Sequence, residues 1–289
     1  MKALVHQVRL VLIALQFLTR MPVPAWVGFQ PAWLQACLPY FPVVGGLVGL
    51  GGALVLAATA AWWPQSVAVV LSMAFTAWFT GGFHEDGLAD TCDALGGTVT
   101  RERALEIMKD SRIGSYGSLA LILMLGLKAA VLIALATPLF TELSSAETSH
   151  VRQVLLGWTM MGLIWCHAAS RLVPVWLIRL MPYGGDVAHA KAKPLAMQVT
   201  TAGAMAATFN TGLIALTLWG WLSFEGWPTS TLLTALAYAF VAMAAGALVC
   251  ARWFMHRLGG FTGDTLGASQ QITEVMGLLA WLAVVHPVT

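Results

Sequence analysis

The sequence is short of charge. Asp, Glu, Lys and Arg make up 10% of its 289 residues, whereas about 25% is usual for a soluble domain. So few ionised side chains cannot cover a water-soluble particle of this size, and a disordered chain needs more of them as well. The formal net charge of +2 provides no basic face, so no nucleic-acid partner is expected.

Cysteine is scarce too. The chain has four cysteines, which lie far apart and match no metal-binding or redox spacing. We interpret them as small buried hydrophobes, so neither a disulfide scaffold nor a thiolate metal site is expected. They are Cys37, Cys92, Cys166 and Cys250.

Hydrophobic residues are what the sequence has in excess, at 58% with a mean hydropathy of +0.78. A helix needs about 20 mostly apolar residues to cross a hydrocarbon layer about 30 Å thick. The sequence therefore predicts an all-α, polytopic membrane helical bundle, a single domain over residues 1–289, with about seven transmembrane helices and six to eight as the range. The expected spans are 39–62, 66–83, 115–138, 151–180, 199–222, 231–255 and 274–288.

The N-terminal segment 4–19 is apolar but too short to span, and it carries His6 and Arg9. We expect it to form an interfacial helix. No small-residue cleavage site follows it, so the segment is not interpreted as a signal peptide.

Basic residues fall almost entirely on one side of this topology, with twelve on that side and Arg152 alone on the other. The positive-inside rule then predicts a cytoplasmic N-terminus and cytoplasmic loops at 84–114 and 257–273. The twelve are Lys2, Arg9, Arg20, Arg101, Arg103, Lys109, Arg112, Arg179, Lys191, Lys193, Arg252 and Arg257.

Two cations, Lys128 and Arg171, fall inside predicted spans, where an unpaired charge is costly. Either could reach toward a buried anionic substrate. The structural alternative, which we favour, is that Lys128 snorkels to the interface and Arg171 forms a structural pair.

Acidic residues gather where the second span ends, in GGFHEDGLADTCDALGG at 81–97. Asp86, Asp90 and Asp93 are spaced i, i+4 and i+7, so they share one face of a helix. Carboxylates this close repel one another, and the segment contains no Lys or Arg to offset them. Oxygen ligands without thiolates or paired imidazoles suit Mg²⁺, so we predict a magnesium site that includes Glu85. The alternative is a solvated acidic loop.

Two further segments carry groups suited to phosphate. LEIMKDSRIGSYG at 105–117 gathers cations and small donors beside the acids, which together with a carboxylate-held metal would clamp a diphosphate. In GGFTGDTLGA at 259–268, glycines would let backbone amides approach a phosphate, although a tight interhelical turn explains them equally well. His84 directly precedes the aspartates and is either a proton acceptor or an interfacial histidine.

These motifs together resemble the cobalamin synthase family. FLTRMPVP at 17–24, YFPVVGGLVG at 40–49 and the three segments above follow the family's order almost from end to end. The resemblance implies an adenosylcobinamide-GDP ribazoletransferase activity. Such an enzyme joins adenosylcobinamide-GDP to α-ribazole or its 5′-phosphate in a Mg²⁺-dependent phosphoryl transfer that releases GMP. It also implies a bacterial cytoplasmic (inner) membrane as the location, with membrane lipid around the chain.

The resemblance assigns roles to the residues of these segments. The expected metal ligands are Asp86, Asp90, Asp93 and Glu85, and the expected catalytic residues are Asp86, His84, Lys109 and Arg112. The expected substrate-binding residues are Asp110, Ser111, Gly263, Asp264 and Thr265. One departure concerns MPYGGDVAHAKAKPL, where Gly184 and Gly185 replace an Arg and acids that many relatives carry, although Lys191 and Lys193 remain nearby.

Two alternatives belong to other classes. A CDP-alcohol-type membrane phosphotransferase would share the chemistry but should have Arg after Ala89, where this sequence has Asp90. A transporter should place polar residues at mid-membrane, whereas here they are expected to crowd at the cytoplasmic end. The sequence leaves open a homo-oligomer and an association with other cobalamin-assembly enzymes.

Overall fold

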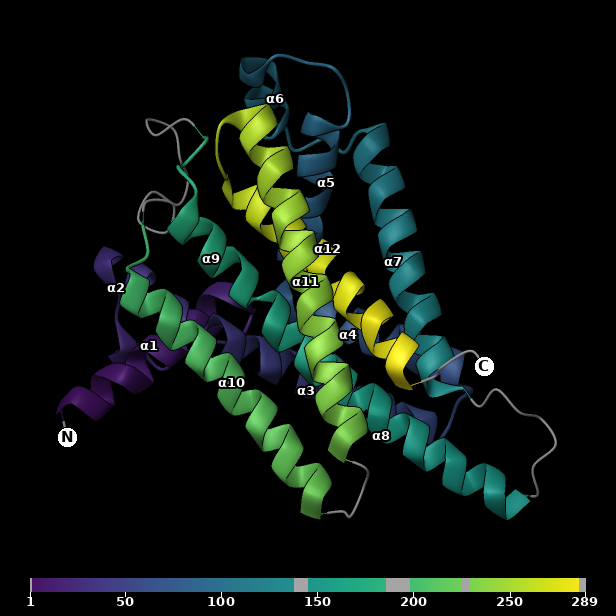
Figure 1. Ribbon diagram of the computed structural model, residues 1–289. Helices are drawn as coiled ribbons and strands as arrows, with labels where there is room; N and C mark the ends of the chain where they lie inside the picture. Colours follow the sequence, from purple (N-terminus) through teal and green to yellow (C-terminus); the bar gives the residue numbers. More distant parts are fainter. Residues whose placement is uncertain (1, 138–144, 186–197, 225–228, 286–289) are drawn as a thin grey trace.

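The structure is a computed structural model that describes residues 2–137, 145–185, 198–224 and 229–285. Over these ranges its regular elements are helices, and the only bridge pairs Tyr183 with Phe261. Six segments are long and apolar enough to cross a membrane, and one bent pair of helices would make a seventh. The prediction of an all-α, multi-pass membrane protein is confirmed (Figure 1).

The elements follow the chain in this order. The N-terminal part contains α1 (Lys2–Leu18), η1 (Ala25–Val27), α2 (Pro31–Ala36), η2 (Leu38–Tyr40), α3 (Phe41–Ala60) and α4 (Gln65–Thr80). The middle part contains α5 (Phe83–Leu95), α6 (Arg101–Ile107), α7 (Ser115–Ala136), α8 (Ser145–Ser170) and α9 (Leu172–Leu180). The last part contains α10 (Thr201–Phe224), α11 (Thr229–Leu258) and α12 (Gly263–Val285).

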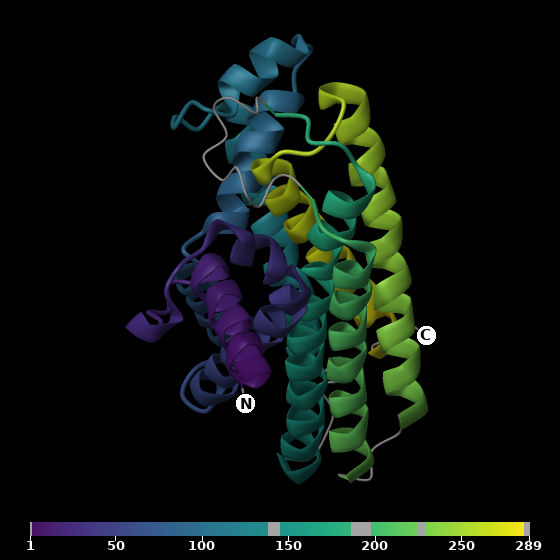
Figure 2. The ribbon, with the colours of Figure 1, turned by 90° about the vertical axis from the view of Figure 1, so that its left-hand side faces the viewer.

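The N-terminal helix α1 has 17 residues and falls short of a span, in agreement with the sequence. It buries Leu10, Ile13 and Leu18 while Leu4 remains 69% exposed. Figure 2 shows it packed beside the α2–α3 region. Its placement at the membrane interface stays a prediction.

Small residues bring α3 and α8 into close contact. A Cβ atom added to Gly45 would collide with the carbonyl oxygen of His167 and lie 2.7 Å from Cδ of Arg171. At Gly49 it would lie 2.6 Å from the carbonyl oxygen of Leu163. Such close approach supplies the dispersion contacts that hold helices together in lipid, where no hydrophobic effect acts between them.

A sharp bend separates α4 from α5. Gly81 and Gly82 have φ of 74° and 70°, a left-handed conformation that glycine adopts without strain. Consequently α5 leaves α4 at 87° and packs across α12 instead of continuing the span. The two helices meet at glycines, because a Cβ on Gly87 would lie 2.8 Å from the carbonyl oxygen of Asp264.

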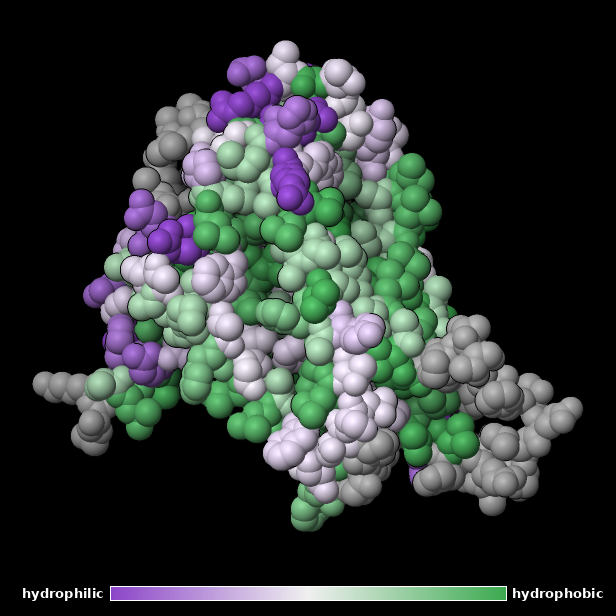
Figure 3. Space-filling view, in the orientation of Figure 1, coloured by the Kyte–Doolittle hydropathy of each residue, from purple (hydrophilic) through white to green (hydrophobic). Residues whose placement is uncertain are grey.

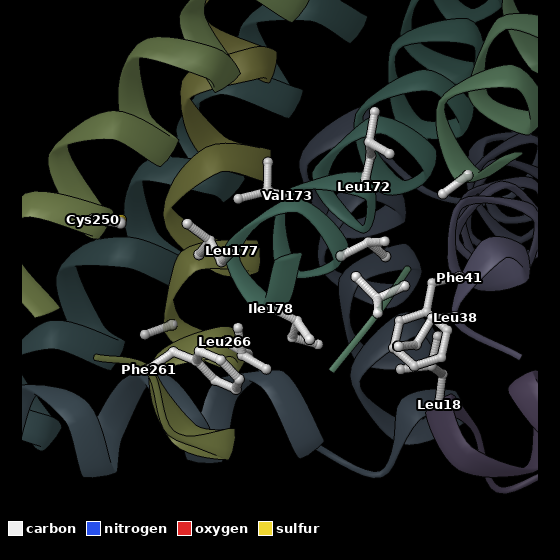
Figure 4. Packing of buried hydrophobic residues seen from close by; sticks show 14 of the residues in the cluster. Leu18, Leu38, Phe41, Leu172, Val173, Leu177, Ile178, Cys250, Phe261 and Leu266 are labelled. Atoms are coloured by element: carbon white, nitrogen blue, oxygen red, sulfur yellow. The ribbon is translucent and has the colours of Figure 1, made fainter. Parts of the chain in front are cut away.

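Apolar side chains from distant parts of the sequence fill the core beneath this crossing. Leu18 and Phe41 from the N-terminal part pack in one cluster with Leu177 of α9 and Leu266 of α12 (Figure 4). Cys250 lies in the same cluster, 1% exposed. All four cysteines are free, and all but the half-buried Cys92 are buried, as predicted.

One predicted boundary is wrong. The last span was expected from residue 274, but α12 begins at Gly263, so residues 263–273 are helical rather than loop. Hydropathy missed this stretch because its Ser269, Gln270 and Gln271 are polar, yet each is buried and hydrogen-bonded inside the bundle. The prediction for Lys191 and Lys193 lies outside the described residues.

Candidate active site

Hydrophilic side chains gather at the end of the molecule where α6 lies, others follow its left-hand side, and the rest of this face is mainly hydrophobic (Figure 3). Helices α5 and α6 and the N-termini of α7 and α12 belong to this end (Figure 1). The three sequence segments predicted to form the site therefore come together in space.

The aspartates lie on a helix, as their spacing predicted. Asp86 is exposed, and Asp90 and Asp93 are half-buried on α5. Asp264, in the first turn of α12, is also half-buried, and its backbone lies against Gly87. The crossing of α5 and α12 thus places Asp264 beside the turn of α5 that carries Asp86 and Asp90.

Asp93 makes a different kind of contact. Its Oδ2 accepts a hydrogen bond from the amide of Gly114 at 2.7 Å, and its Oδ1 accepts one from the amide of Gly117 at 2.8 Å. Gly114 is the N-cap of α7, and no side-chain cap is present in that turn itself. Asp93 therefore caps a helix whose N-cap residue lies 21 residues later in the sequence.

The two residues that precede Asp86 turn toward α12. Glu85 accepts a hydrogen bond from Nε2 of Gln271 at 3.2 Å. His84 is 4% exposed, and a Cβ on Gly267 of α12 would lie 3.4 Å from its Cα atom. Both side chains thus belong to the α5–α12 contact, whereas Asp86 is exposed.

The segment between α6 and α7 carries the predicted phosphate-binding cations. Asp110 and Arg112 form an exposed ion pair with an Oδ2–Nη2 distance of 2.6 Å. Hydrogen bonds from Arg112 lower the pKa of Asp110 to about 2. Lys109 and Ser111 are exposed as well.

A reciprocal cap begins α12. The amide of Thr262 donates to Oγ1 of Thr265 at 2.8 Å, and the amide of Thr265 donates to Oγ1 of Thr262 at 3.3 Å. Thr265 is fully buried, so in this structure its hydroxyl serves the cap, while Gly263 is exposed. Oγ1 of Thr262 also lies 3.7 Å from Sδ of Met108, which places the segment after α6 next to this helix end.

Two arginines fasten the helices of this end together. Arg257 of α11 donates to the carbonyl oxygens of Leu95 and Gly97, both at 2.7 Å, just where α5 ends. Arg101 of α6 donates to the carbonyl oxygens of Leu258 at 2.8 Å and Gly184 at 2.7 Å. These two cations bind backbone and so act on the shape of the site.

The carboxylates of the polar end fit Mg²⁺ only if water and substrate phosphate complete its coordination shell. In the described ranges, no three or more His, Cys, Asp and Glu side chains are grouped so that they could hold a metal ion by themselves. Mg²⁺ usually takes one or two protein carboxylates and completes its shell with water and substrate phosphate oxygens. Asp86 and Asp90, one turn apart on α5, match that requirement.

A second charged cluster lies inside the bundle, and sequence reasoning missed it. Glu274 of α12 forms ion pairs with Lys128 of α7, with Nδ1 of His167 at 2.9 Å and with Nη1 of Arg171 at 3.7 Å. All four side chains are at most 3% exposed. Gln270 adds a hydrogen bond to Glu274 at 2.6 Å.

This cluster decides between the interpretations of the two intramembrane cations. The structural pairing expected of Arg171 is confirmed, whereas the snorkelling expected of Lys128 is wrong, because its ammonium group is buried against Glu274. The expectation that polar residues crowd at one end was also incomplete. Matching the two cations against Glu274 in the last predicted span would have been the signal.

Comparison with known protein families matches residues 10–282 to the family described as cobalamin-5-phosphate synthase. The chain belongs to that family. It is 53% identical over 283 residues to a protein of Leptothrix cholodnii named adenosylcobinamide-GDP ribazoletransferase, with 98% of each chain covered. A protein of the same name from Polaromonas sp. is 42% identical to this chain, with 93% of this chain and 94% of the relative covered. Another from Shewanella amazonensis is also 42% identical to this chain, with 96% of both covered.

No solved structure matches this member of the cobalamin-5-phosphate synthase family. The family match includes every segment of the polar end, from the glycine bend before α5 to the cap of α12. It also includes the buried cluster around Glu274.

Proposed function

We propose that this chain transfers the cobinamide phosphoryl group of adenosylcobinamide-GDP to α-ribazole, or to α-ribazole 5′-phosphate, with release of GMP. The observation that carries the proposal is the family match over residues 10–282, together with the ribazoletransferase name of its relatives. The polar end supports it, because phosphoryl transfer needs mainly positioning groups and charges that offset those of the phosphates.

The proposed step is a displacement at phosphorus. The hydroxyl oxygen of α-ribazole forms a bond to the cobinamide-side phosphorus, and the bond from that phosphorus to the bridging oxygen of GMP breaks. GMP leaves with the electron pair of that bond, and the hydroxyl proton passes to a base of the protein. The product carries the phosphodiester of adenosylcobalamin, or of its 5′-phosphate.

Asp86 and Asp90 are the proposed ligands of Mg²⁺, with Asp264 contributing from α12. When bound, the ion would polarise the diphosphate oxygens and offset the charge that develops on them. The exposed carboxylate of Asp86, in a segment without Lys or Arg, supports this assignment. Glu85 accepts a hydrogen bond from Gln271, and Asp93 accepts two from the start of α7.

Lys109 and Arg112 are the proposed cations for the transferring phosphoryl group and the leaving GMP. Both are exposed on the segment between α6 and α7. Arg112 is paired with Asp110, so substrate phosphate would compete with that carboxylate for the guanidinium. Ser111 and the backbone amide of Gly263, an exposed residue, would add neutral donors.

A carboxylate of α5 is the proposed acceptor of the hydroxyl proton, in preference to His84. The histidine is 4% exposed and packs against α12, which sets it back from the surface that carries Asp86. A general base must come within hydrogen-bonding reach of the hydroxyl that it deprotonates.

The polar end is proposed to face the cytoplasm, in the inner membrane of a bacterium. Arg101, Arg103, Lys109, Arg112, Arg252 and Arg257 belong to α6, the segment after it or the last turns of α11. This charge bias supports the orientation through the positive-inside rule.

The test is turnover by the purified full-length protein in liposomes. Adenosylcobinamide-GDP and α-ribazole are supplied with Mg²⁺ or with EDTA, and the corrinoid product and GMP are quantified together. We expect equimolar product and GMP that depend on Mg²⁺. A well-folded protein that forms neither would overturn the proposal, and formation of both in EDTA would remove the metal from it.

A further inference from the structure

We propose that Asp93 is a positioning residue that fixes the start of α7, and with it the segment carrying Lys109 and Arg112, to the aspartate helix α5. The proposal rests on the proposed function for the importance of those cations. It reassigns Asp93, which its spacing with Asp86 and Asp90 predicts to be a metal ligand.

The first observation is that both oxygens of Asp93 are engaged by α7. They accept hydrogen bonds of 2.7 Å and 2.8 Å from the amides of Gly114 and Gly117. The first amides of a helix have no partner within the helix, and its N-terminus carries a partial positive charge. A carboxylate satisfies both needs, and Asp93 provides it from another helix.

The second observation is that the space beside Asp93 accounts for two glycines. Gly114 has φ of −97° and Gly117 is helical, so neither needs glycine for its backbone conformation. A Cβ added at either position would collide with the carboxylate of Asp93, and at Gly117 it would also lie 2.8 Å from the carbonyl oxygen of Ala89. A side chain there would push α7 away from α5.

The consequence concerns the relative position of the cations and the other aspartates. Gly114 follows Arg112 by two residues, so the hydrogen bond at Gly114 fixes one end of the cation-bearing segment. Asp90 lies about one helical turn before Asp93 on the same face of α5. Loss of the Asp93 contact would therefore change the distance between the proposed metal ligands and the proposed phosphate clamp.

Variants on both sides of the contact test this. Asp93→Asn keeps one acceptor and replaces the other with a donor, while Gly117→Ala leaves Asp93 in place and forces the helices apart. Gly126→Ala is the matched control, because it adds the same methyl group to the same helix where a Cβ meets nothing within 4 Å.

Three readouts are taken on the full-length protein in detergent or liposomes. Hydrogen exchange at residues 115–118 reports on the start of α7, electron paramagnetic resonance of added Mn²⁺ reports on metal binding, and steady-state kinetics report on the reaction. We expect faster exchange and a fall in kcat/KM of about tenfold to a hundredfold for Asp93→Asn and Gly117→Ala, since small misplacements cost this much. Mn²⁺ binding should change by less than about twofold, and Gly126→Ala should match the parent protein in all three.

Loss of Mn²⁺ binding in Asp93→Asn, with binding intact in Gly117→Ala, would overturn the proposal and restore Asp93 as a ligand. Unchanged exchange at 115–118 in both variants would overturn it as well. Hydrogen exchange needs no substrate and Mn²⁺ binding needs no turnover, so a failure of the proposed reaction is read separately, as absence of product from the parent protein.

Discussion

Two groups of charged side chains in this protein are built in opposite ways. Inside the bundle, the carboxylate of Glu274 is shared by two cations and a histidine, and all of them are at most 3% exposed. On α5, three aspartates follow one another on one face of a helix, in a segment that contains no Lys or Arg. The first group sets one carboxylate against two cations, whereas the second has no cation in its segment and is strongly negative.

The difference follows from what surrounds each group. In a low-dielectric interior an unpaired charge is expensive, so charges persist there only when opposite partners are in place. At the polar end water can hydrate a carboxylate, and repulsion between neighbouring acids costs only about 0.2–0.5 kcal/mol per pair. The cluster around Glu274 thus keeps its buried charges beside opposite ones, and we propose that the exposed Asp86 keeps its charge for a ligand.

The largest expected effect is a loss of activity on substitution of an aspartate of α5. Asp86→Asn should lower turnover about a thousandfold, because charge stabilisation by a metal ion is worth several kcal/mol. The stability of the fold should stay the same or rise slightly, since one carboxylate repulsion is removed. Turnover in liposomes and thermal unfolding in detergent measure the two quantities. Retained turnover would remove Asp86 from the site.

The converse substitution should act on stability. Glu274→Gln leaves Lys128 and Arg171 without a carboxylate in the interior, and removal of one partner from a buried pair typically costs about 3–5 kcal/mol. We expect a lower yield of folded protein and a lower unfolding temperature than for Asp86→Asn. Equal unfolding temperatures for the two variants would break the comparison.

A second substitution sharpens that result. Combining Glu274→Gln with Lys128→Met removes the carboxylate and one of its cations together, so less unpaired charge remains buried. The double variant should recover part of the lost stability, because neutral replacement of a buried pair is often tolerated. A double variant less stable than Glu274→Gln would show that Lys128 contributes mainly by packing.

A smaller effect is expected for the cations that bind backbone at the polar end. Arg257→Lys loses the two-pronged contact to Leu95 and Gly97, which should cost about 1–3 kcal/mol of stability. The exposed Arg252, five residues earlier on the same helix, is the control, and Arg252→Lys should change little. Similar unfolding temperatures for both variants would contradict the fastening role of Arg257.

The smallest effect is electrostatic. Arg112 holds the pKa of Asp110 at about 2, below the ordinary 3.8, so this pair favours the folded state above about pH 4 and ceases to do so as the pH falls through 2. In Arg112→Ala the pKa of Asp110 should return toward 3.8. Carbon-13 NMR of labelled aspartate measures it, and an unchanged value would assign the low pKa to another cause.

Some of this architecture could be predicted from the sequence. The helix carrying the aspartates followed from their spacing. The helix α7 was expected at 115–138 and lies at Ser115–Ala136, because beyond its first turn it is apolar except for Lys128. The start of α12 could not be placed, since hydropathy treats Gln270 and Gln271 as exposed although both are buried. Polar residues that bond to one another inside a bundle defeat a scale based on transfer from water.

The sequence predicted which residues gather at the site, but not which of its carboxylates contact other helices. Spacing alone makes Asp86, Asp90 and Asp93 equivalent, because each lies on the same helix face. Only the fold brings the N-terminus of α7 to Asp93 and Gln271 to Glu85, over separations of 21 and 186 residues. Contacts at such distances along the chain leave no local pattern to read.

The most direct test of the account is Mn²⁺ binding by the parent protein, Asp86→Asn and Glu274→Gln, measured by electron paramagnetic resonance in the presence of adenosylcobinamide-GDP. Mn²⁺ accepts the same oxygen ligands as Mg²⁺ and carries the unpaired electrons that the measurement needs. The account predicts that Asp86→Asn loses bound Mn²⁺, while the folded fraction of Glu274→Gln retains it. Equal Mn²⁺ binding by the parent protein and Asp86→Asn would contradict it.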